Sequence, residues 1–152
     1  MEVYRLSRLK FAGSLSGKGA AVKGGRWNSA GIELIYTAAN RSLAMAEVAV
    51  HFTLATLPPD YVMMTLFIPD NVSIQEVNID DLPLGWNSFP HQLSTRQIGD
   101  RLAAENKTCL IKVPSAVTKG DFNILINPNH IEFAGIKIVE VSPFPFDKRI
   151  FK

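Results

Sequence analysis

Short apolar runs that end at proline, glycine or asparagine dominate the chain, and such runs predict strands. A strand opens the chain, and six more follow it. These six predicted strands are residues 33–38, 61–68, 72–77, 109–113, 123–126 and 136–141. Residues 6–31 are rich in glycine, serine and lysine and are predicted to be irregular, whereas residues 127–130 (NPNH) are predicted to form a turn.

Two stretches show helical periodicity instead. Residues 42–54 follow Asn40-Arg41-Ser42, which offers N-cap side chains, and the helix must end before Pro58-Pro59. Residues 92–106 also repeat apolar side chains at helical spacing. Because strands outnumber helices and do not alternate with them, the order predicts an α+β fold, with a mixed, mostly antiparallel sheet and a few helices.

Composition indicates one domain over residues 1–152, since 47% of the residues are hydrophobic and 20% are charged. The single cysteine, Cys109, excludes an internal disulfide and a multi-cysteine metal site. The three histidines share no metal-ligand spacing, so no metal is expected. No apolar run reaches the roughly 18–20 residues of a membrane span, and residues 1–5 lack the order of a signal peptide. We expect a cytoplasmic protein.

Positive charge is concentrated at the start of the chain. Residues 1–29 hold six basic side chains and one acidic side chain, a net charge of +5, whereas the remaining residues hold ten basic and thirteen acidic side chains, a net charge of −3. This distribution favours an anionic ligand such as a phosphate, a nucleic acid or an acidic partner. A solvated basic surface explains the charge equally well. Gly13–Gly17 does not fit a dinucleotide-binding fingerprint, because no clear strand precedes it.

Glu47 is an unusual residue in the first predicted helix. Helical spacing places it on one apolar face with Leu43, Ala46, Val50 and Leu54. A carboxylate buried on such a face is costly unless it is paired or hydrogen-bonded. Three interpretations of Glu47 are therefore open: it is a functional group, it lies at the edge of the face and reaches water, or it pairs with an arginine.

Three further residues, Arg26, Tyr36 and Ser115, have side chains that could bind a ligand, and each also has a purely structural interpretation. Arg26 lies in the stretch Gly24–Asn28 (GGRWN), where glycines allow close approach of a ligand and the guanidinium offers a planar fork for phosphate or carboxylate; a surface arginine packed on a tryptophan is the alternative. Tyr36 offers a ring for stacking and a hydroxyl, although a core tyrosine is more common. Ser115 lacks a nucleophile-elbow motif and has the pattern of a turn residue.

Six stretches of the chain, in this order, resemble the RES-domain family, and together they extend from Tyr4 to about Phe133. The stretches are Tyr4–Leu6, Gly25–Gly31, Ile35–Ala38, Ser42–Glu47, Val113–Val117 and Asn123–His130. The resemblance implies a fold similar to ADP-ribosyltransferases and the toxin of a bacterial toxin–antitoxin pair. It also implies consumption of NAD⁺ with release of nicotinamide, and an antitoxin partner that carries a helix-turn-helix DNA-binding domain.

The resemblance also assigns residues. It places the family's arginine, glutamate and serine at Arg26, Glu47 and Ser115, its tyrosine at Tyr36 and its early arginine at Arg5. We expect Arg26, Tyr36 and Glu47 to be catalytic. We expect Arg5, Ser115 and the neighbouring Asn28 to bind NAD⁺.

The expected chemistry is consistent with these residue types. Cleavage of the nicotinamide–ribose bond builds oxocarbenium character, which a fixed carboxylate such as Glu47 can stabilise. Arg26 and Arg5 suit the pyrophosphate, and Tyr36 suits stacking on nicotinamide. Ser115 suits either a hydrogen bond to the nicotinamide amide or the positioning of Glu47.

Two other functions stay open at this point. The first is transfer of ADP-ribose to a cellular protein, since the sequence does not distinguish water, phosphate and protein as acceptors. The second is a non-enzymatic anion-binding or nucleic-acid-binding module built on residues 5–26. The net charge of only +2 and the lack of a nucleic-acid-binding signature argue against direct nucleic-acid binding. The oligomeric state, including a homodimer within a toxin–antitoxin complex, also stays open.

Overall fold

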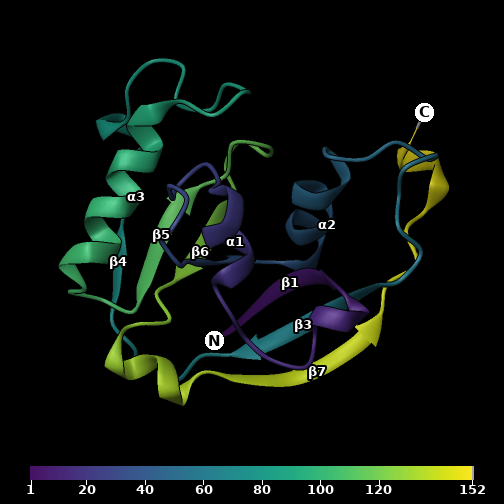
Figure 1. Cartoon of the computed structure of the whole chain (residues 1–152), viewed down its shortest axis with the longest axis horizontal. Coiled ribbons are helices and arrows are strands. Elements are labelled where there is room, and N and C mark those ends of the chain that lie inside the picture. The colour runs from purple at the N-terminus through teal and green to yellow at the C-terminus, as the bar shows by residue number, and fades with distance from the viewer. Residues whose placement is uncertain (152) are drawn as a thin grey trace.

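Seven strands form a single sheet in the order β4-β5-β6-β2-β1-β3-β7 (Figure 1). The structure is a computed structural model, and it describes residues 1–151. The strands are β1 Glu2–Arg8, β2 Ile35–Ala38, β3 Tyr61–Phe67, β4 Ile74–Glu76, β5 Leu110–Pro114, β6 Phe122–Ile126 and β7 Lys137–Pro143. Only β4 and β5 pair in parallel, so the predicted α+β fold with a mixed, mostly antiparallel sheet is confirmed.

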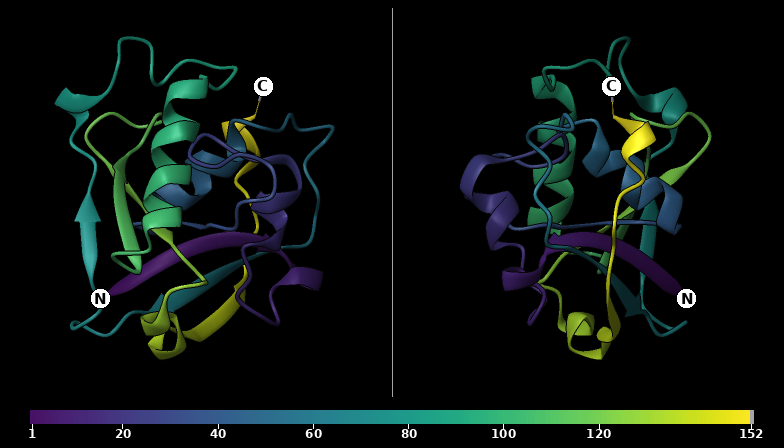
Figure 2. Two further views of the ribbon diagram at one scale, coloured as in Figure 1. Left: turned by 60° about the vertical axis from the view of Figure 1, so that its left-hand side comes forward. Right: turned by 90° about the vertical axis from the view of Figure 1, so that its right-hand side faces the viewer.

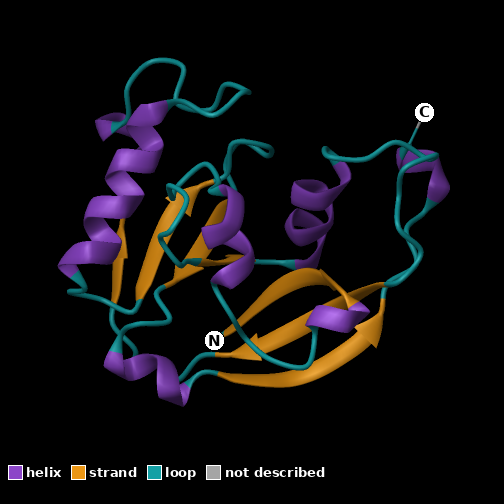
Figure 3. Cartoon of the chain, viewed as in Figure 1, coloured by secondary structure: helices purple, strands orange, loops and turns teal. Residues whose placement is uncertain are grey.

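Three α-helices and four short 3₁₀ segments complete the described chain (Figure 3). The helices are α1 Lys18–Lys23, α2 Arg41–Ala49 and α3 Leu93–Glu105, and the 3₁₀ segments are η1 Leu9–Phe11, η2 Ile79–Asp81, η3 Ile131–Gly135 and η4 Lys148–Ile150. As predicted, Asn40 caps α2: its Oδ1 accepts a hydrogen bond from the backbone N–H of Leu43 at 2.8 Å.

Two local predictions are wrong. The helix α2 ends at Ala49 rather than at residue 54. After Val50 the backbone N–H groups of His51 and Phe52 bond only three residues back, so the chain leaves the α-helix well before the prolines. In addition, residues 6–31 are not irregular throughout: β1 extends to Arg8, and α1 lies inside the stretch, where glycines conceal the helical pattern of a six-residue segment.

The sheet divides into two halves at the junction of β1 and β2. The pairing of β1 with β3 runs along the whole of Glu2–Arg8, whereas β1 pairs with β2 only at Tyr4 and Ala38. Figures 1 and 2 show the β4-β5-β6 half and the β1-β3-β7 half running in different directions. The short pairing therefore leaves a gap in the sheet between residues that follow Tyr4 and residues that precede Ala38.

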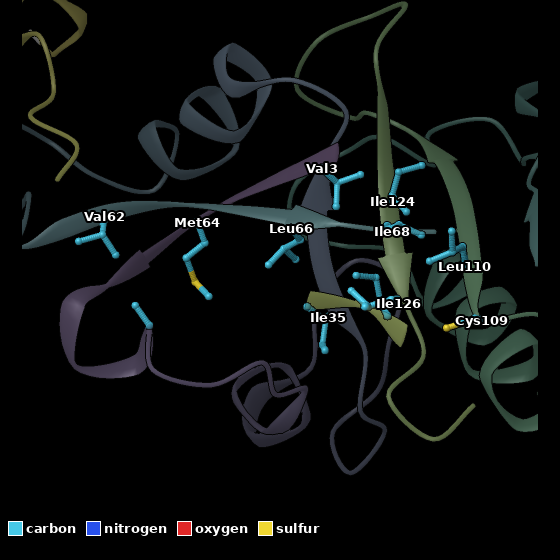
Figure 4. Packing of buried hydrophobic residues seen from close by; sticks show 12 residues of the cluster. Val3, Ile35, Val62, Met64, Leu66, Ile68, Cys109, Leu110, Ile124 and Ile126 are labelled. Carbon is cyan, nitrogen blue, oxygen red and sulfur yellow. The ribbon is translucent and has the colours of Figure 1, made fainter. Parts of the chain in front are cut away.

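Buried apolar side chains form three clusters, and one of them holds the two halves together. The central cluster spans both halves and includes Val3, Ile35, Leu66 and Ile126 (Figure 4). A second cluster lies between α3 and the β5-β6 half, and a third lies between α2 and the β1-β3-β7 half. Each half thus has one helix on it, and the gap between the halves lies between α2 and α3. Within residues 1–151, no helix is both long and apolar enough to cross a membrane.

The helix α3 contacts the backbone of the Gly24–Asn28 stretch without a side chain between them. A Cβ atom at Gly99 would overlap with the carbonyl oxygen of Trp27. Trp27 itself is 3% exposed and packs in the second cluster. A glycine is required at this point because any larger residue would push the helix away from the loop.

We expect Gly99→Ala to destabilise the protein by about 2–4 kcal/mol, because the added methyl group meets backbone atoms that cannot rotate away. Chemical denaturation measures the change. Gly13→Ala is the matched control, since a Cβ at Gly13 meets nothing within 4 Å. Equal stability of the two variants would contradict the close contact between α3 and Trp27.

Candidate active site

A cleft of about 770 Å³ lies at the gap between the two halves of the sheet. This volume is typical of small-molecule sites. Among the residues predicted for the site, Arg5, Arg26, Tyr36 and Glu47 all line it. These four come from β1, the loop after α1, β2 and α2, so the fold brings together residues that are far apart in the sequence.

Arg26 lies in a tight turn that only glycines permit. Gly24 has a φ of +76°, and a Cβ at Gly25 would lie 2.8 Å from the Tyr36 hydroxyl. The Arg26 Nη1 donates hydrogen bonds to the carbonyl oxygens of Trp86 at 2.8 Å and Ser88 at 3.0 Å. Within residues 1–151, Nε and Nη2 of Arg26 donate no hydrogen bond, which leaves them available to a ligand in the cleft.

The helix α3 fixes this turn from the outside with residues at i, i+3 and i+4 spacing. Arg96 Nε donates to the carbonyl oxygen of Gly25 at 2.9 Å. Asp100 accepts from the backbone N–H of Ser29 at 2.8 Å and from its hydroxyl at 2.5 Å. Together with the contact at Gly99, these bonds hold the backbone on both sides of Arg26.

Tyr36 presents its ring to the cleft while its hydroxyl is fully bonded. The hydroxyl donates to Asn28 Oδ1 at 2.6 Å and accepts from the backbone N–H of Trp27 at 3.0 Å. Burial, the largest effect, raises the pKa of Tyr36 well above its usual range, although the Trp27 hydrogen bond opposes the shift. Tyr36 therefore stays neutral, and its ring orientation is fixed.

Asn28 lies behind the cleft rather than on its wall. The side chain is 0% exposed, and its Nδ2 donates to three carbonyl oxygens, those of Ala20, Ser29 and Ile32. With Oδ1 bound to Tyr36, the amide has no group directed at a ligand. The geometry favours a positioning residue that acts through Tyr36 over direct contact with NAD⁺.

Glu47 is the only carboxylate that lines the cleft in the described chain. It shares the cleft-facing side of α2 with Ala44 and Val48, and Val50 and His51, just beyond the helix, also line the cleft. The predicted apolar stripe through Val50 and Leu54 is wrong, because these side chains are 60% and 50% exposed. Both residues lie beyond the end of α2, whereas Leu43, which the predicted stripe included, is buried together with Ala44.

Ser115 reaches Glu47 from the loop between β5 and β6. Its hydroxyl donates to Glu47 Oε1 at 2.9 Å and accepts from the backbone N–H groups of Val117 at 3.1 Å and Thr118 at 3.0 Å. The hydroxyl has only one proton to donate, and its hydrogen bond goes to Glu47. Ser115 is 5% exposed and does not line the cleft, so the geometry favours the positioning of Glu47 over a bond to nicotinamide.

The arginines give the cleft its electrostatic character. Arg5 Nη1 donates to the carbonyl oxygen of Tyr36 at 3.2 Å, and burial lowers the pKa of Arg5. Burial also lowers the pKa of Arg26, although the charge of Glu47 opposes this shift. Neither guanidinium has a carboxylate within 4.0 Å in residues 1–151, so the cleft favours an anion.

Several residues that line the cleft or hold its arginine turn were not predicted from the sequence. They are Arg96 and Asp100, which hold the arginine turn, and His51, Phe89 and His91, which line the cleft. The one available signal was the i, i+4 spacing of Arg96 and Asp100 on the polar side of a predicted helix. In residues 1–151, no group of three His, Cys, Asp or Glu side chains is arranged to hold a metal ion.

Comparison with known proteins gives consistent matches. The family model described as RES domain matches residues 2–147. The chain is 35% identical over 143 residues to the Prs ADP-ribosylating toxin of Sphingobium sp. (strain YBL2), covering 93% of this chain and 89% of that protein. It is also 35% identical over 154 residues to the Toxin Res of Photorhabdus laumondii, covering 100% of this chain and 98% of that protein.

A solved structure shares the fold. A chain of the M. tuberculosis MbcT–MbcA toxin–antitoxin complex superposes with a TM-score of 0.77 at 18% identity, covering 95% of this chain and 84% of that chain. At this identity the likeness concerns the arrangement of helices and strands alone.

The raised pKa of Tyr36 predicts a pH dependence of stability. Above about pH 10 the unfolded tyrosine ionises while the folded one stays neutral, so stability falls as the pH rises. We expect Tyr36→Phe to be about 1–2 kcal/mol less stable at neutral pH, because Asn28 and Trp27 lose a partner. We also expect its stability to fall less steeply above pH 10. Denaturation at several pH values measures both effects, and parallel pH profiles for the two proteins would contradict the shift.

Proposed function

The chain belongs to the RES-domain family, and from that premise we propose that it is the toxin of a type II toxin–antitoxin pair that depletes NAD⁺ by cleaving the nicotinamide–ribose bond. One observation carries the proposal: a single carboxylate, Glu47, lines a cleft whose two guanidinium groups have no acidic partner in residues 1–151. NAD⁺ combines a pyrophosphate anion with a ribose that becomes cationic in the transition state, and the cleft offers a group for each.

The reaction requires little of the protein at the leaving group. When the ribose C1′–N bond breaks, the bonding electrons pass to the nicotinamide nitrogen, which loses its positive charge and needs no proton. The developing oxocarbenium ion is stabilised by the fixed negative charge of Glu47, and a nucleophile then bonds to C1′. Since one carboxylate faces the cleft, a glycosidase mechanism with two carboxylates is disfavoured.

The arginines and Tyr36 have complementary roles in the proposal. Nε and Nη2 of Arg26 donate to the pyrophosphate, and Arg5 adds a second positive charge. The ring of Tyr36, held by Asn28, stacks on nicotinamide and orients the bond that breaks. Asn28 and Ser115 act as positioning residues.

The main proposal and its alternative differ in the group that accepts ADP-ribose after nicotinamide has left. In the main proposal water or phosphate bonds to C1′, and NAD⁺ is depleted. In the alternative the acceptor is a side chain of a cellular protein, and the printed name of the Sphingobium relative, an ADP-ribosylating toxin, supports that alternative.

The proposed partner is an antitoxin that carries a helix-turn-helix DNA-binding domain. The solved complex that shares the fold supports an antitoxin partner, since it is a toxin–antitoxin complex. DNA binding then belongs to the partner chain. The proposed substrate is a cytoplasmic dinucleotide, so we place the reaction in the cytoplasm.

We expect Glu47→Gln to reduce nicotinamide release from NAD⁺ by about 100-fold to 1,000-fold, because the amide keeps the shape of the side chain and removes the charge. Glu140→Gln, in an exposed part of β7, is the matched control and should retain full activity. Free ADP-ribose or its 1-phosphate indicates depletion, and label on a protein indicates the alternative. Equal rates for the wild type and Glu47→Gln would disprove the role of Glu47.

We expect Ser115→Ala to lower kcat by about 10-fold with little change in KM, because Glu47 loses the hydrogen bond that orients it. The affinity for ADP-ribose, which lacks the reacting bond, should stay the same. If affinity falls together with kcat, the serine supports the cleft as a whole rather than Glu47 in particular.

A further inference from the structure

Phe89 is a large apolar side chain that lines the cleft and is nevertheless 75% exposed. It lies in residues 82–92, the loop between η2 and α3. In Figure 1 this loop lies at the upper end of the molecule, and its tip reaches from α3 toward α2. None of the three buried apolar clusters includes Phe89. Its ring therefore has an open face at the mouth of the cleft.

The backbone beside Phe89 is held in place. Arg26 Nη1 binds the carbonyl oxygens of Trp86 and Ser88, the residue that immediately precedes Phe89. The Trp86 ring packs on Trp27, with their centroids 6.2 Å apart. The backbone is fixed at Trp86 and again at Ser88, so Phe89 is exposed on an anchored part of the loop.

Arg26 connects this loop to the carboxylate of the cleft. Its Nη1 binds the carbonyl oxygen of Ser88, the residue before Phe89, and Arg26 lines the same cleft as Glu47 and Phe89. The Phe89 ring packs edge-to-face on His91, with their centroids 5.5 Å apart, and both rings line the cleft. An anion bound to Arg26 therefore has the Phe89 ring beside it in the same cleft.

We propose that Phe89 stacks against the adenine base of NAD⁺ while the pyrophosphate lies on Arg26 and the nicotinamide ribose lies at Glu47. This inference rests on the proposed function and deepens it by assigning the adenosine end of the substrate. In this arrangement the pyrophosphate at Arg26 joins the base at Phe89 to the nicotinamide riboside at Glu47.

The chemistry of the ring suits a base rather than the pyrophosphate or a sugar. A phenyl ring has no hydrogen-bonding group, so it recognises a flat partner through its face. Stacking of a base on an aromatic side chain changes affinity by about 10-fold to 100-fold. Since adenine is remote from the bond that breaks, Phe89 should affect binding and leave the chemical step unchanged.

Titration of ADP-ribose into the purified protein tests the assignment, because ADP-ribose has the adenosine end and lacks nicotinamide. We expect Phe89→Ala to weaken ADP-ribose binding by about 10-fold and to raise the KM for NAD⁺ similarly, with kcat unchanged. Phe89→Trp should bind as well as the wild type. Leu84→Ala is the control, since Leu84 is fully exposed in the same loop and does not line the cleft.

Four outcomes overturn the assignment. If ADP-ribose binding is unchanged while the KM for NAD⁺ rises, the ring contacts nicotinamide. If both are unchanged, Phe89 does not touch the substrate, and its exposed face serves a protein partner. If Phe89→Leu binds as well as Phe89→Trp, the contact is apolar and not stacking. If the wild type itself does not bind ADP-ribose, there is no adenosine site. A wild type that binds ADP-ribose but releases no nicotinamide refutes the proposed function instead, and the ADP-ribose titration still decides the role of Phe89.

Discussion

A single residue pair, Tyr4 with Ala38, joins the two halves of the sheet, and the position of the cleft depends on this sparse pairing. Strands that pair along their whole length leave no opening between them. Here β1 continues along β3 and β2 continues along β6, so the two central strands separate. Arg5 lies one residue after Tyr4 on β1, and Tyr36 lies two residues before Ala38 on β2. Both therefore line the cleft beside the point where the two strands separate.

The polar groups around that cavity fall into two classes. The Tyr36 hydroxyl, the Asn28 amide and the Ser115 hydroxyl bond to protein atoms only. The guanidinium groups of Arg5 and Arg26 are half-buried cations without a carboxylate within 4.0 Å in residues 1–151. Burial of such cations costs free energy that a bound anion offsets. The first class thus fixes the shape of the site, while the arginines of the second class favour the binding of an anion.

Much of the sheet follows from local sequence, because each strand is a short apolar run with clear breaks. The limits of such reasoning are visible at Ser115 and Glu47. Both residues were singled out, but they lie 68 positions apart, and no local pattern reports that one donates to the other. Arg96 and Asp100 look like ordinary surface charges of a helix, and only the tertiary structure shows that they bind the Gly24–Asn28 backbone and Ser29. The short length of α2 likewise depends on a turn that propensities do not specify.

The shared use of Arg26 has a thermodynamic consequence. One nitrogen of this guanidinium binds the carbonyl oxygens of Trp86 and Ser88, and Arg26 also lines the cleft. Occupancy of the cleft and order in the loop before α3 are therefore linked equilibria, and linkage is reciprocal. A macromolecule whose binding changes the order of this loop would change the affinity of the cleft for its ligand, and the ligand would change the affinity for that macromolecule by the same factor.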